Sequence, residues 1–388
     1  MAQTVRHEDG LTIVELEGSI TSTNAGELDE AIRNEPTLDG MVMDADKLAY
    51  ISSAGLRVLL SAKKRCKDKP FRIVNVNDEV MSILDVTGFS EIMDVSRKMR
   101  RLSIDESKKI GSGACGEVYR LDDETIIKLY YPRVGQDEIE REKALAKKAF
   151  VLGVPTAISY DIVEADGRTG VVYELIKSKT LGELIREDGG NIEHYVGIYA
   201  DVCRQIHSID AKGAGLPSFK DINRADIPNV TGITDKERQY LYDFLDLVPE
   251  RSTCIHGDLN INNIMVQDGE CCLIDMGEFS TGHPMFDMSR ILFSMQYAAD
   301  TTKDFNAFYK MPNSTVEKTL KMLLQRYFEA DTLEEAQEKH PDVKWLHPLA
   351  WFRCCTSMLK GDRWPEAKRN EALGLLMDKL IPFVDANR

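Results

Sequence analysis

The sequence predicts two domains, a small α/β domain followed by a larger α+β domain. Its 388 residues exceed what a single hydrophobic core usually contains. Residues 1–96 alternate strand-like and helix-like segments, as α/β domains do. Residues 105–388 begin with strand-like segments and continue with mainly helical ones, and we expect a basic, solvated connector at 97–104.

The first domain is expected to contain three main strands and three helices. The segment LTIVELEGSI alternates apolar and polar residues, which is typical of a half-buried strand. Serine, threonine or asparagine residues precede the helical segments, where they can cap free backbone N–H groups. We expect strands at 11–20, 41–51 and 71–76 and helices at 21–34, 52–66 and 77–89.

The second domain opens with strand-like segments around KKIGSG, EVYRLD and TIIKLYY. A charged helix, DEIEREKALAKKAF, follows, and the apolar stretch after it indicates strands joined by turns. From LGELIRED onward, helical patterns dominate.

The composition describes an acidic globular protein with a formal net charge of −15. Nucleic-acid binding needs Lys and Arg to neutralise phosphates, so we expect no nucleic-acid partner. No stretch approaches about 18 unbroken apolar residues, and the N-terminus lacks an apolar signal-peptide core, so we expect no membrane association. The eight cysteines lack zinc-site and disulfide spacings, which favours reduced thiols in a cytoplasmic protein.

A glycine-rich segment, GSGACGEV, is followed by a strand rather than by a helix. A turn between two strands is the plainer interpretation of this segment alone. Its small residues would also allow backbone amides to approach nucleotide phosphates, as in a phosphate-covering flap. The glycines of this candidate flap are Gly111, Gly113 and Gly116.

Lys128 lies in the next strand-like segment, between two apolar residues. A lysine in that position is costly unless it is paired or bound to an anion. The expected partners are a nucleotide phosphate and a carboxylate of the charged helix. Glu142 is the favoured carboxylate, and Glu138, one turn earlier on the same face, is the alternative.

The segment CIHGDLNINNIM places polar side chains between apolar ones. It indicates a tight polar loop held against the core, where a rigid scaffold can aim side chains at a reaction centre. A turn between two strands with satisfied polar groups is the alternative. Asp258 can orient or deprotonate an attacking hydroxyl, and Asn263 can bind a divalent cation through its amide oxygen. Asp275, at the end of a later strand, offers with Asn263 the hard oxygen ligands that suit Mg²⁺.

Together these features resemble the protein-kinase-like phosphotransferases, in particular the aminoglycoside phosphotransferase and choline-kinase branch. HGDLNINN is similar to that branch's H-G-D-x-x-x-x-N, and IDMGE parallels D-F-G. The glycine loop, the lysine, the glutamate, the catalytic loop and the final aspartate follow the family order. The resemblance covers about residues 105–388 and implies a two-lobed protein kinase-like fold, with an N-lobe at about 105–173 and a C-lobe at about 177–388. It also implies ATP and Mg²⁺ as cofactors.

The same resemblance assigns roles to residues outside these anchors. VVYELI would join the lobes, so Glu174 and Ile176 would meet the adenine through backbone groups. HPMFDMSR is similar to the branch's G-x-P-x-x-D-L-A, so Asp287 would brace the catalytic loop and His256 would be structural. Asn260 stands where protein serine kinases commonly carry a lysine, which leaves the acceptor open between a protein serine and a small molecule.

The segment DKLAYISSAGLRVLL resembles the STAS domain of anti-sigma factor antagonists, and the likeness extends over about residues 1–96. Ser52 and Ser53 stand at a helix start, where free N–H groups stabilise a phosphate. Both can instead serve as simple helix caps. Ser53 is the best match to the family's phosphorylated serine, whereas Ser52 stands where classical members have aspartate. The resemblance implies an anti-sigma factor or another STAS-binding protein as partner.

The sequence therefore predicts an ATP- and Mg²⁺-dependent phosphotransferase that is fused to a STAS domain and acts on a hydroxyl group in bacterial regulatory signalling. One alternative is a kinase for aminoglycosides, amino alcohols or sugars that uses its STAS domain only for docking. Another is a non-enzymatic, nucleotide-binding regulator of an anti-sigma factor, which the intact set of anchors disfavours.

Overall fold

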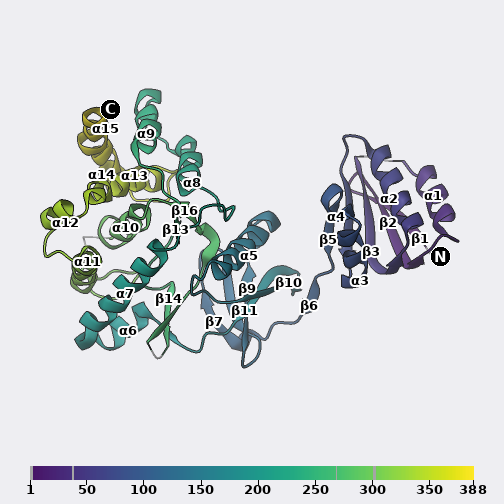
Figure 1. The fold of residues 1–388 in the computed structure, drawn as a ribbon, viewed down its shortest axis with the longest axis horizontal. Helices are drawn as coiled ribbons and strands as arrows, with labels where there is room; N and C mark the ends of the chain where they lie inside the picture. The colour runs from purple at the N-terminus through teal and green to yellow at the C-terminus, as the bar shows by residue number, and fades with distance from the viewer. Residues whose placement is uncertain (1–2, 37–38, 268, 300–302) are drawn as a thin grey trace. The chain divides into compact units, whose positions relative to one another are not determined.

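The computed structural model describes residues 3–36, 39–267, 269–299 and 303–388. The chain divides into two compact units, Met1–Ser103 and Ile104–Arg388, each with its own hydrophobic core (Figure 1). Within the described residues, no helix is both long and apolar enough to span a bilayer. The eight cysteines all belong to the described part, and each is a free thiol there.

The first unit is an α/β domain built on a five-stranded sheet of order β1-β2-β3-β4-β5. β1 runs antiparallel to β2, and the remaining neighbours are parallel. Its elements are β1 (Gln3–Glu8), β2 (Leu11–Ile20), α1 (Ala25–Asn34), β3 (Gly40–Ile51), α2 (Ser53–Cys66), β4 (Phe71–Val76), α3 (Asp78–Val86), α4 (Phe89–Ile92), β5 (Asp94–Arg97) and β6 (Arg100–Leu102).

The expected strands correspond to β2, β3 and β4, whereas β1, β5 and β6 were not expected from the sequence. β1 and β5 are edge strands, and their polar sequences QTVRHE and DVSR carry no clear alternation. The helix expected at 77–89 is divided into α3 and α4, because Gly88 adopts a left-handed backbone conformation (φ 71°) that ends the first of them. Strand β6 forms inside the segment interpreted as the connector.

Helix α2 packs closely on the sheet at Gly55. A Cβ atom added there would lie 2.6 Å from Cγ2 of Ile20 and 2.7 Å from Cγ1 of Ile51. No real side chain tolerates such distances, so the glycine of the motif SSAGL permits the close helix–sheet contact. That contact positions the start of α2, which carries the two candidate serines.

The second unit opens with antiparallel strands that neighbour one another in the order β10-β11-β9-β8-β7. Helix α5 packs against β10, β11 and η4. This part contains η1 (Glu106–Lys108), β7 (Lys109–Ser112), β8 (Gly116–Arg120), β9 (Thr125–Tyr130), α5 (Gln136–Val151), β10 (Ser159–Ala165) and β11 (Arg168–Glu174).

The remainder of the second unit is mainly helical and contains two small sheets, β12-β14-β15 and β13-β16. Its elements are β12 (Lys179–Thr180), α6 (Leu181–Glu187), η2 (Gly189–Asn191), α7 (Ile192–His207), α8 (Phe219–Asp226), η3 (Ile227–Asn229), α9 (Asp235–Leu247), β13 (Thr253–Ile255), β14 (Ile264–Gln267), β15 (Glu270–Leu273), η4 (Met276–Glu278), β16 (Ser280–Gly282), α10 (Met285–Leu292), η5 (Phe293–Tyr297), α11 (Asn313–Phe328), α12 (Leu333–Lys339), η6 (Pro341–Trp345), α13 (Leu346–Met358), α14 (Glu366–Leu375), η7 (Leu376–Leu380) and α15 (Ile381–Asn387).

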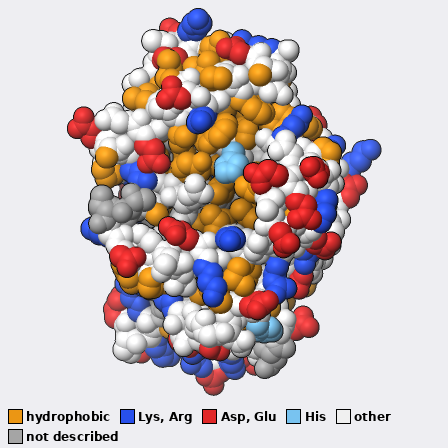
Figure 2. All heavy atoms as spheres, turned by 90° about the vertical axis from the view of Figure 1, so that its left-hand side faces the viewer, with side chains coloured by type: hydrophobic (Ala, Val, Ile, Leu, Met, Phe, Trp, Pro, Cys, Tyr) orange, Lys and Arg blue, Asp and Glu red, His pale blue; other side chains and the backbone are white. Residues whose placement is uncertain are grey.

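Local sequence starts several of these helices. Thr180 and Glu183 form a reciprocal capping box at α6, and Thr234 and Glu237 form another at α9. The helices then bury one continuous apolar cluster that includes the strands around the polar loop. Figure 2 shows the face on the left-hand side of Figure 1, where hydrophobic side chains gather around a central hollow with charged side chains about it.

Candidate active site

Lys128, in the middle of β9, forms an ion pair with Glu142 of α5. Its neighbours Ile127 and Leu129 are buried, so the alternation of the strand turns the lysine to the opposite face. The distance from Nζ to Oε1 of Glu142 is 2.7 Å, and the two side chains are only 17% and 10% exposed. An ion pair this sheltered is screened less by solvent than a surface pair. Glu138, the alternative partner in the sequence, is exposed on α5.

Two tyrosines lie beside this ion pair. The hydroxyl of Tyr173 donates to Oε1 of Glu142 at 3.4 Å, and Nζ of Lys128 lies 5.2 Å from the ring centroid of Tyr130. Burial and the carboxylate of Glu142 raise the pKa of both tyrosine hydroxyls, which therefore stay protonated at neutral pH. Sequence reasoning missed both residues, because a tyrosine in a buried strand has the pattern of an ordinary core residue.

Asp275 lies close to the same lysine. Nζ of Lys128 donates to Oδ1 of Asp275 at 3.1 Å. Burial alone would lower the pKa of Lys128, but the carboxylates of Asp275 and Glu142 outweigh it and raise that pKa, so the lysine is a cation. Asp275 has φ 63° and ψ 63°, a left-handed conformation that costs a non-glycine residue about 1–3 kcal/mol. Such strain is retained where the direction of a side chain matters.

Asn263 fixes Asp258 in the polar loop between β13 and β14. Its Nδ2 donates to the backbone carbonyl of Asp258 at 2.9 Å and to Oδ2 at 3.1 Å. Asn260, which is buried, donates to the same carbonyl at 3.3 Å. Because Nδ2 of Asn263 is used by Asp258, its Oδ1 remains the atom that could bind a cation.

Asp287 holds the start of this loop. Its Oδ2 accepts from the backbone N–H of His256 at 2.9 Å, and its Oδ1 accepts from that of Gly257 at 2.8 Å. Nε2 of His207 lies 3.2 Å from Oδ2 of Asp287, and Nδ1 of the same ring lies 2.8 Å from the hydroxyl oxygen of Tyr327. Burial would raise the pKa of Asp287, but the interactions with His207 and with His256 lower it below its usual value. Sequence reasoning missed His207, which carries no local motif.

The ring of His256 is engaged by backbone on both sides. Nε2 lies 3.1 Å from the carbonyl of Ile274, and Nδ1 accepts from the N–H of Asp258 at 3.2 Å. The next residue, Gly257, has φ 85°, and an added Cβ would lie 2.6 Å from Cβ of Glu278. Only glycine fits there, so the H-G-D order reflects both the turn and its packing.

The loop and the strand before Asp275 are joined directly. The N–H of Ile274 donates to the carbonyl of Asn263 at 3.0 Å. This bond brings Asn263 next to the segment that ends in Asp275. The structure thus brings Lys128, Glu142, Asn263 and Asp275 together around neighbouring strands.

In the glycine-rich segment, Gly116 is the one of the three candidate glycines that no larger residue could replace without a steric clash. An added Cβ at Gly116 would lie 2.5 Å from the carbonyl oxygen of Leu129. At Gly113 an added Cβ would meet open space, and at Gly111 it would lie 3.8 Å from Cβ of Val118. The N–H of Gly113 donates to the carbonyl of Gly116 at 2.9 Å and closes the turn.

The predicted adenine-binding segment follows β11. Glu174 is the last residue of that strand, and its N–H donates to the carbonyl of Ile158 at 2.9 Å. The carbonyl of Ile176 accepts from the N–H of Ser178 at 2.9 Å, which turns the chain toward β12.

In the first unit, the two candidate serines differ in their environment. Ser52 caps α2, and its side chain accepts from the N–H of Gly55 at 3.5 Å. Ser53 is the first residue of the 14-residue helix, is exposed and makes no side-chain hydrogen bond within the described residues. Only one of the two hydroxyls is therefore committed to capping.

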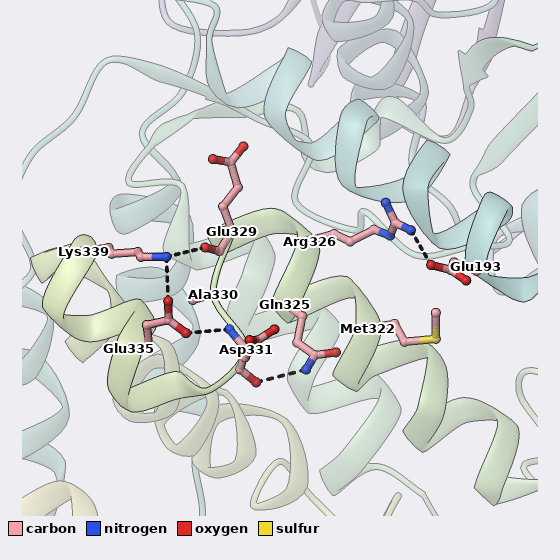
Figure 3. A pocket seen from close by; sticks show the side chains of 9 residues that line it. All are labelled: Glu193, Met322, Gln325, Arg326, Glu329, Ala330, Asp331, Glu335 and Lys339. Atoms are coloured by element: carbon pink, nitrogen blue, oxygen red, sulfur yellow. Dashed lines mark hydrogen bonds and ion pairs between the residues drawn. The ribbon is translucent and has the colours of Figure 1, made fainter.

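A separate cavity of about 470 Å³ lies among α7, α11 and α12. Figure 3 shows that its charged side chains pair with one another: Arg326 with Glu193 at 3.0 Å, and Lys339 with Glu335 at 2.7 Å. None of the residues proposed for phosphate transfer lines it. We assign no function to this cavity.

Comparisons with known proteins agree with this division. Residues 106–323 match the model of the phosphotransferase enzyme family, and residues 2–102 match that of the STAS domain. A Bordetella bronchiseptica protein named as an anti-sigma factor antagonist, BtrV, is 32% identical over 100 residues, which are 25% of this chain and 86% of that protein.

The chain also resembles two solved structures. The ternary complex of APH(2")-IIa with streptomycin and ATP has 13% identity and a TM-score of 0.46, over 71% of this chain and 92% of that one. A choline/ethanolamine kinase family protein from Mesorhizobium loti has 12% identity and a TM-score of 0.44, over 72% and 92%.

The family models confirm both resemblances, because the phosphotransferase model alone spans more than half of the chain and the STAS model spans the first unit. The chain belongs to the phosphotransferase enzyme family, and its first unit is a STAS domain.

Proposed function

We propose that the second unit transfers the γ-phosphate of ATP to a hydroxyl group, with Mg²⁺ as the metal ion. The observation that carries this proposal is the set of contacts around one lysine. Lys128 lies 2.7 Å from Glu142 and 3.1 Å from Asp275. Asp258 is held by Asn263 in the adjoining loop.

The donor atoms near Asp275 fit a magnesium ion. Its side chain is half exposed, and Asn263 directs its N–H groups to Asp258 while its amide oxygen remains a candidate ligand. Carboxylate and amide oxygens are hard ligands of the kind that Mg²⁺ takes alongside phosphates and water. When bound, Mg²⁺ neutralises charge on the phosphate oxygens.

Different residues of the protein would then position the phosphates, the acceptor hydroxyl and the adenine. Lys128 binds phosphate oxygens, with Glu142 fixing the direction of its ammonium group. Asp258 accepts the proton of the acceptor hydroxyl. The oxygen of that hydroxyl bonds to the γ-phosphorus while the bond between the γ-phosphorus and the leaving oxygen of ADP breaks. Gly111, Gly113 and Gly116 cover the phosphates, and backbone groups of Glu174 and Ile176 meet the adenine.

Asn260 favours a small-molecule acceptor over a protein serine. It occupies the position at which protein serine kinases commonly carry a lysine, and its side chain is buried. Its Nδ2 donates to the carbonyl of Asp258, and its Oδ1 accepts from the N–H of Asn262 at 2.9 Å. Because both ends of the amide bind the loop itself, Asn260 does not project toward an acceptor.

The test is incubation of the purified chain with γ-labelled ATP and Mg²⁺, with and without candidate alcohols, followed by mass mapping of the label. We expect slow hydrolysis alone, faster turnover with an acceptor, and neither in Asp258→Asn. Wild-type protein that binds no Mg-ATP, or Asp258→Asn that turns over ATP at the wild-type rate, would contradict the proposal.

For the STAS domain we propose that Ser53 is a phosphorylation site that governs binding to an anti-sigma factor or a related partner. Its exposed hydroxyl at the start of α2 supports this choice over Ser52, which caps the helix. A phosphate adds roughly two negative charges next to free N–H groups and so changes the charge of the surface a partner meets. We further propose that the kinase domain, besides its small-molecule acceptor, uses Ser53 of its own or another copy of the chain as a second acceptor and so supplies this phosphate.

Phosphosite mapping after incubation with Mg-ATP distinguishes these possibilities. We expect phosphate on Ser53 in the wild type and none in Ser53→Ala or Asp258→Asn, with Ser52→Ala still modified. Label on a small acceptor but none on either serine would instead favour a small-molecule kinase whose STAS domain serves only for docking.

A further inference from the structure

Arg353, on α13, carries a guanidinium group that makes no hydrogen bond or ion pair with any residue that the structure describes. Its Nε is shielded from solvent and lacks a partner. The residue as a whole is half-buried, so part of its surface is reached by solvent. The guanidinium carbon lies 5.7 Å from the ring centroid of Phe293.

This group lies close to the proposed catalytic loop. Neighbouring Arg290 donates from Nη1 to the backbone carbonyl of Gly257 and to the carboxylate of Glu278, and its Nε is also buried without a partner. Gly257 immediately precedes Asp258 in the chain. Helices α10 and α13, which carry the two arginines, pack against each other. Arg290 therefore contacts the loop at the residue before Asp258, and Arg353 lies on the helix that packs against that of Arg290.

The surrounding charges do not pair with Arg353 directly. Burial and the Arg290 guanidinium lower the pKa of Arg353 to about 10, while the carboxylates of Glu278, Asp226 and Asp258 act in the opposite direction. At neutral pH the group remains a cation. A half-buried cation without a direct partner is costly, and packing alone would be served as well by an apolar side chain.

We propose that Arg353 binds an anionic group of the phosphate acceptor, so that the acceptor is a hydroxyl compound that also carries a carboxylate or phosphate. This inference rests on the proposed function, because it takes Asp258 as the group that faces the acceptor hydroxyl. A guanidinium offers a planar pair of donors that matches a carboxylate or phosphate. An anion bound at Arg353 would give its guanidinium group the partner that it lacks within the protein. The guanidinium of Arg290 is a second positive charge nearby, and it offsets the repulsion of that anion by the carboxylates of Glu278 and Asp258.

The test measures anion binding without requiring the acceptor to be known. Sulfate and, separately, acetate are titrated into the full chain by calorimetry in the presence of saturating Mg-ADP, which fills the sites for the α- and β-phosphates of the nucleotide. Sulfate stands for a phosphate group and acetate for a carboxylate, so the preferred anion identifies the acceptor's charged group. The variants are Arg353→Gln and Arg353→Met. Lys318→Gln is the matched control, because Lys318 is an exposed lysine on α11 and is not among the charged groups that act on Arg353.

We expect the wild type and Lys318→Gln to bind one of the two anions with equal affinity. Both Arg353 variants should bind that anion at least tenfold more weakly while keeping the wild-type affinity for Mg-ADP. Arg353→Met should also melt at a higher temperature, since it removes a half-buried, unpaired charge. If either variant fails to fold, Arg353→Lys replaces it, with an expected loss of several-fold because an ammonium group lacks the planar fork.

Equal anion affinity in the wild type and the Arg353 variants would overturn the inference, as would a wild type that binds neither anion. Failure of the proposed function has a different signature, because the wild type would then not bind Mg-ADP at all.

Discussion

The ammonium group of Lys128 lies 3.1 Å from a carboxylate oxygen of Asp275, a residue 147 positions later in the chain. One cation is thus shared between Asp275, after β15, and Glu142, on α5. The position of α5 and the position of the segment after β15 are linked through this lysine. Any change that moves α5 is therefore expected to alter phosphate binding.

Substitution of Glu142 by glutamine should weaken catalysis while leaving the fold intact. The amide keeps the shape of the carboxylate but loses the charge that orients Lys128. The ion pair with Asp275 is then the one that remains of the two ion pairs that Lys128 forms. We expect kcat/KM for ATP to fall about 10- to 100-fold, or roughly 1.4–2.8 kcal/mol. Glu138→Gln, on the same helix but exposed, is the matched control and should change kcat/KM less than about twofold. Equal losses in the two variants would contradict a special role for Glu142.

Asp258→Asn should reduce phosphate transfer by about 10²–10⁴-fold, the usual contribution of a general base. Its affinity for Mg-ADP, measured by calorimetry, should stay close to that of the wild type, because the role that we propose for Asp258 is on the acceptor and not on the nucleotide. Asn263→Ala should instead weaken Mg²⁺ dependence, since it removes the candidate amide ligand and frees Asp258.

Asn262→Ala is the control for Asn263→Ala, because the side chain of Asn262 makes no hydrogen bond to Asp258 within the described residues. We expect it to retain the wild-type response to Mg²⁺ in a titration of initial rates. If both asparagine variants needed equally more Mg²⁺, the assignment of Asn263 as a ligand would be wrong.

Asp287 should contribute stability that depends on pH. Its pKa is lowered in the folded chain, so its stabilising effect is fully present above the ordinary value of about 4 and is lost as the pH falls through the lower, folded value. Asp287→Asn cannot accept from both backbone N–H groups as the carboxylate does, and we expect a loss of about 3–5 kcal/mol at pH 7.

Thermal melting between pH 3 and pH 8 checks this expectation. The difference between wild type and Asp287→Asn should be large at neutral pH and shrink below about pH 4. Asp362→Asn, at a fully exposed carboxylate, should melt within about 0.5 kcal/mol of the wild type throughout. A constant difference across the whole pH range would show that the charge of Asp287 is not what stabilises the loop.

The two compact units should be separable by limited proteolysis within residues 97–104. Each unit buries its own apolar cluster, and few apolar residues lie in that basic segment. We expect trypsin to yield two resistant fragments whose masses correspond to the two units. Early cleavage inside β2–β4 or α7, with 97–104 intact, would argue against independent folding.

Much of this protein was determined by local sequence. Strands β2, β3 and β4 follow from alternation, and helix starts follow from capping residues such as Ser52. The motif HGDLNINN located Asp258 and Asn263, because a short loop brings residues five positions apart together whatever surrounds it. The family resemblance likewise rested on residue types at fixed spacing.

Only the tertiary structure decided which residues meet across the fold. On α5, Glu138 and Glu142 share one helix face; the sequence favoured Glu142 but kept Glu138 as the alternative, and the packing of α5 against η4 and the sheet places Glu142 beside Lys128. The contact of His207 with Asp287 and the unpaired state of Arg353 likewise depend on helices brought together from distant parts of the chain. Periodicity and capping act over a few residues, whereas burial and pairing of charges depend on what the completed core places beside them.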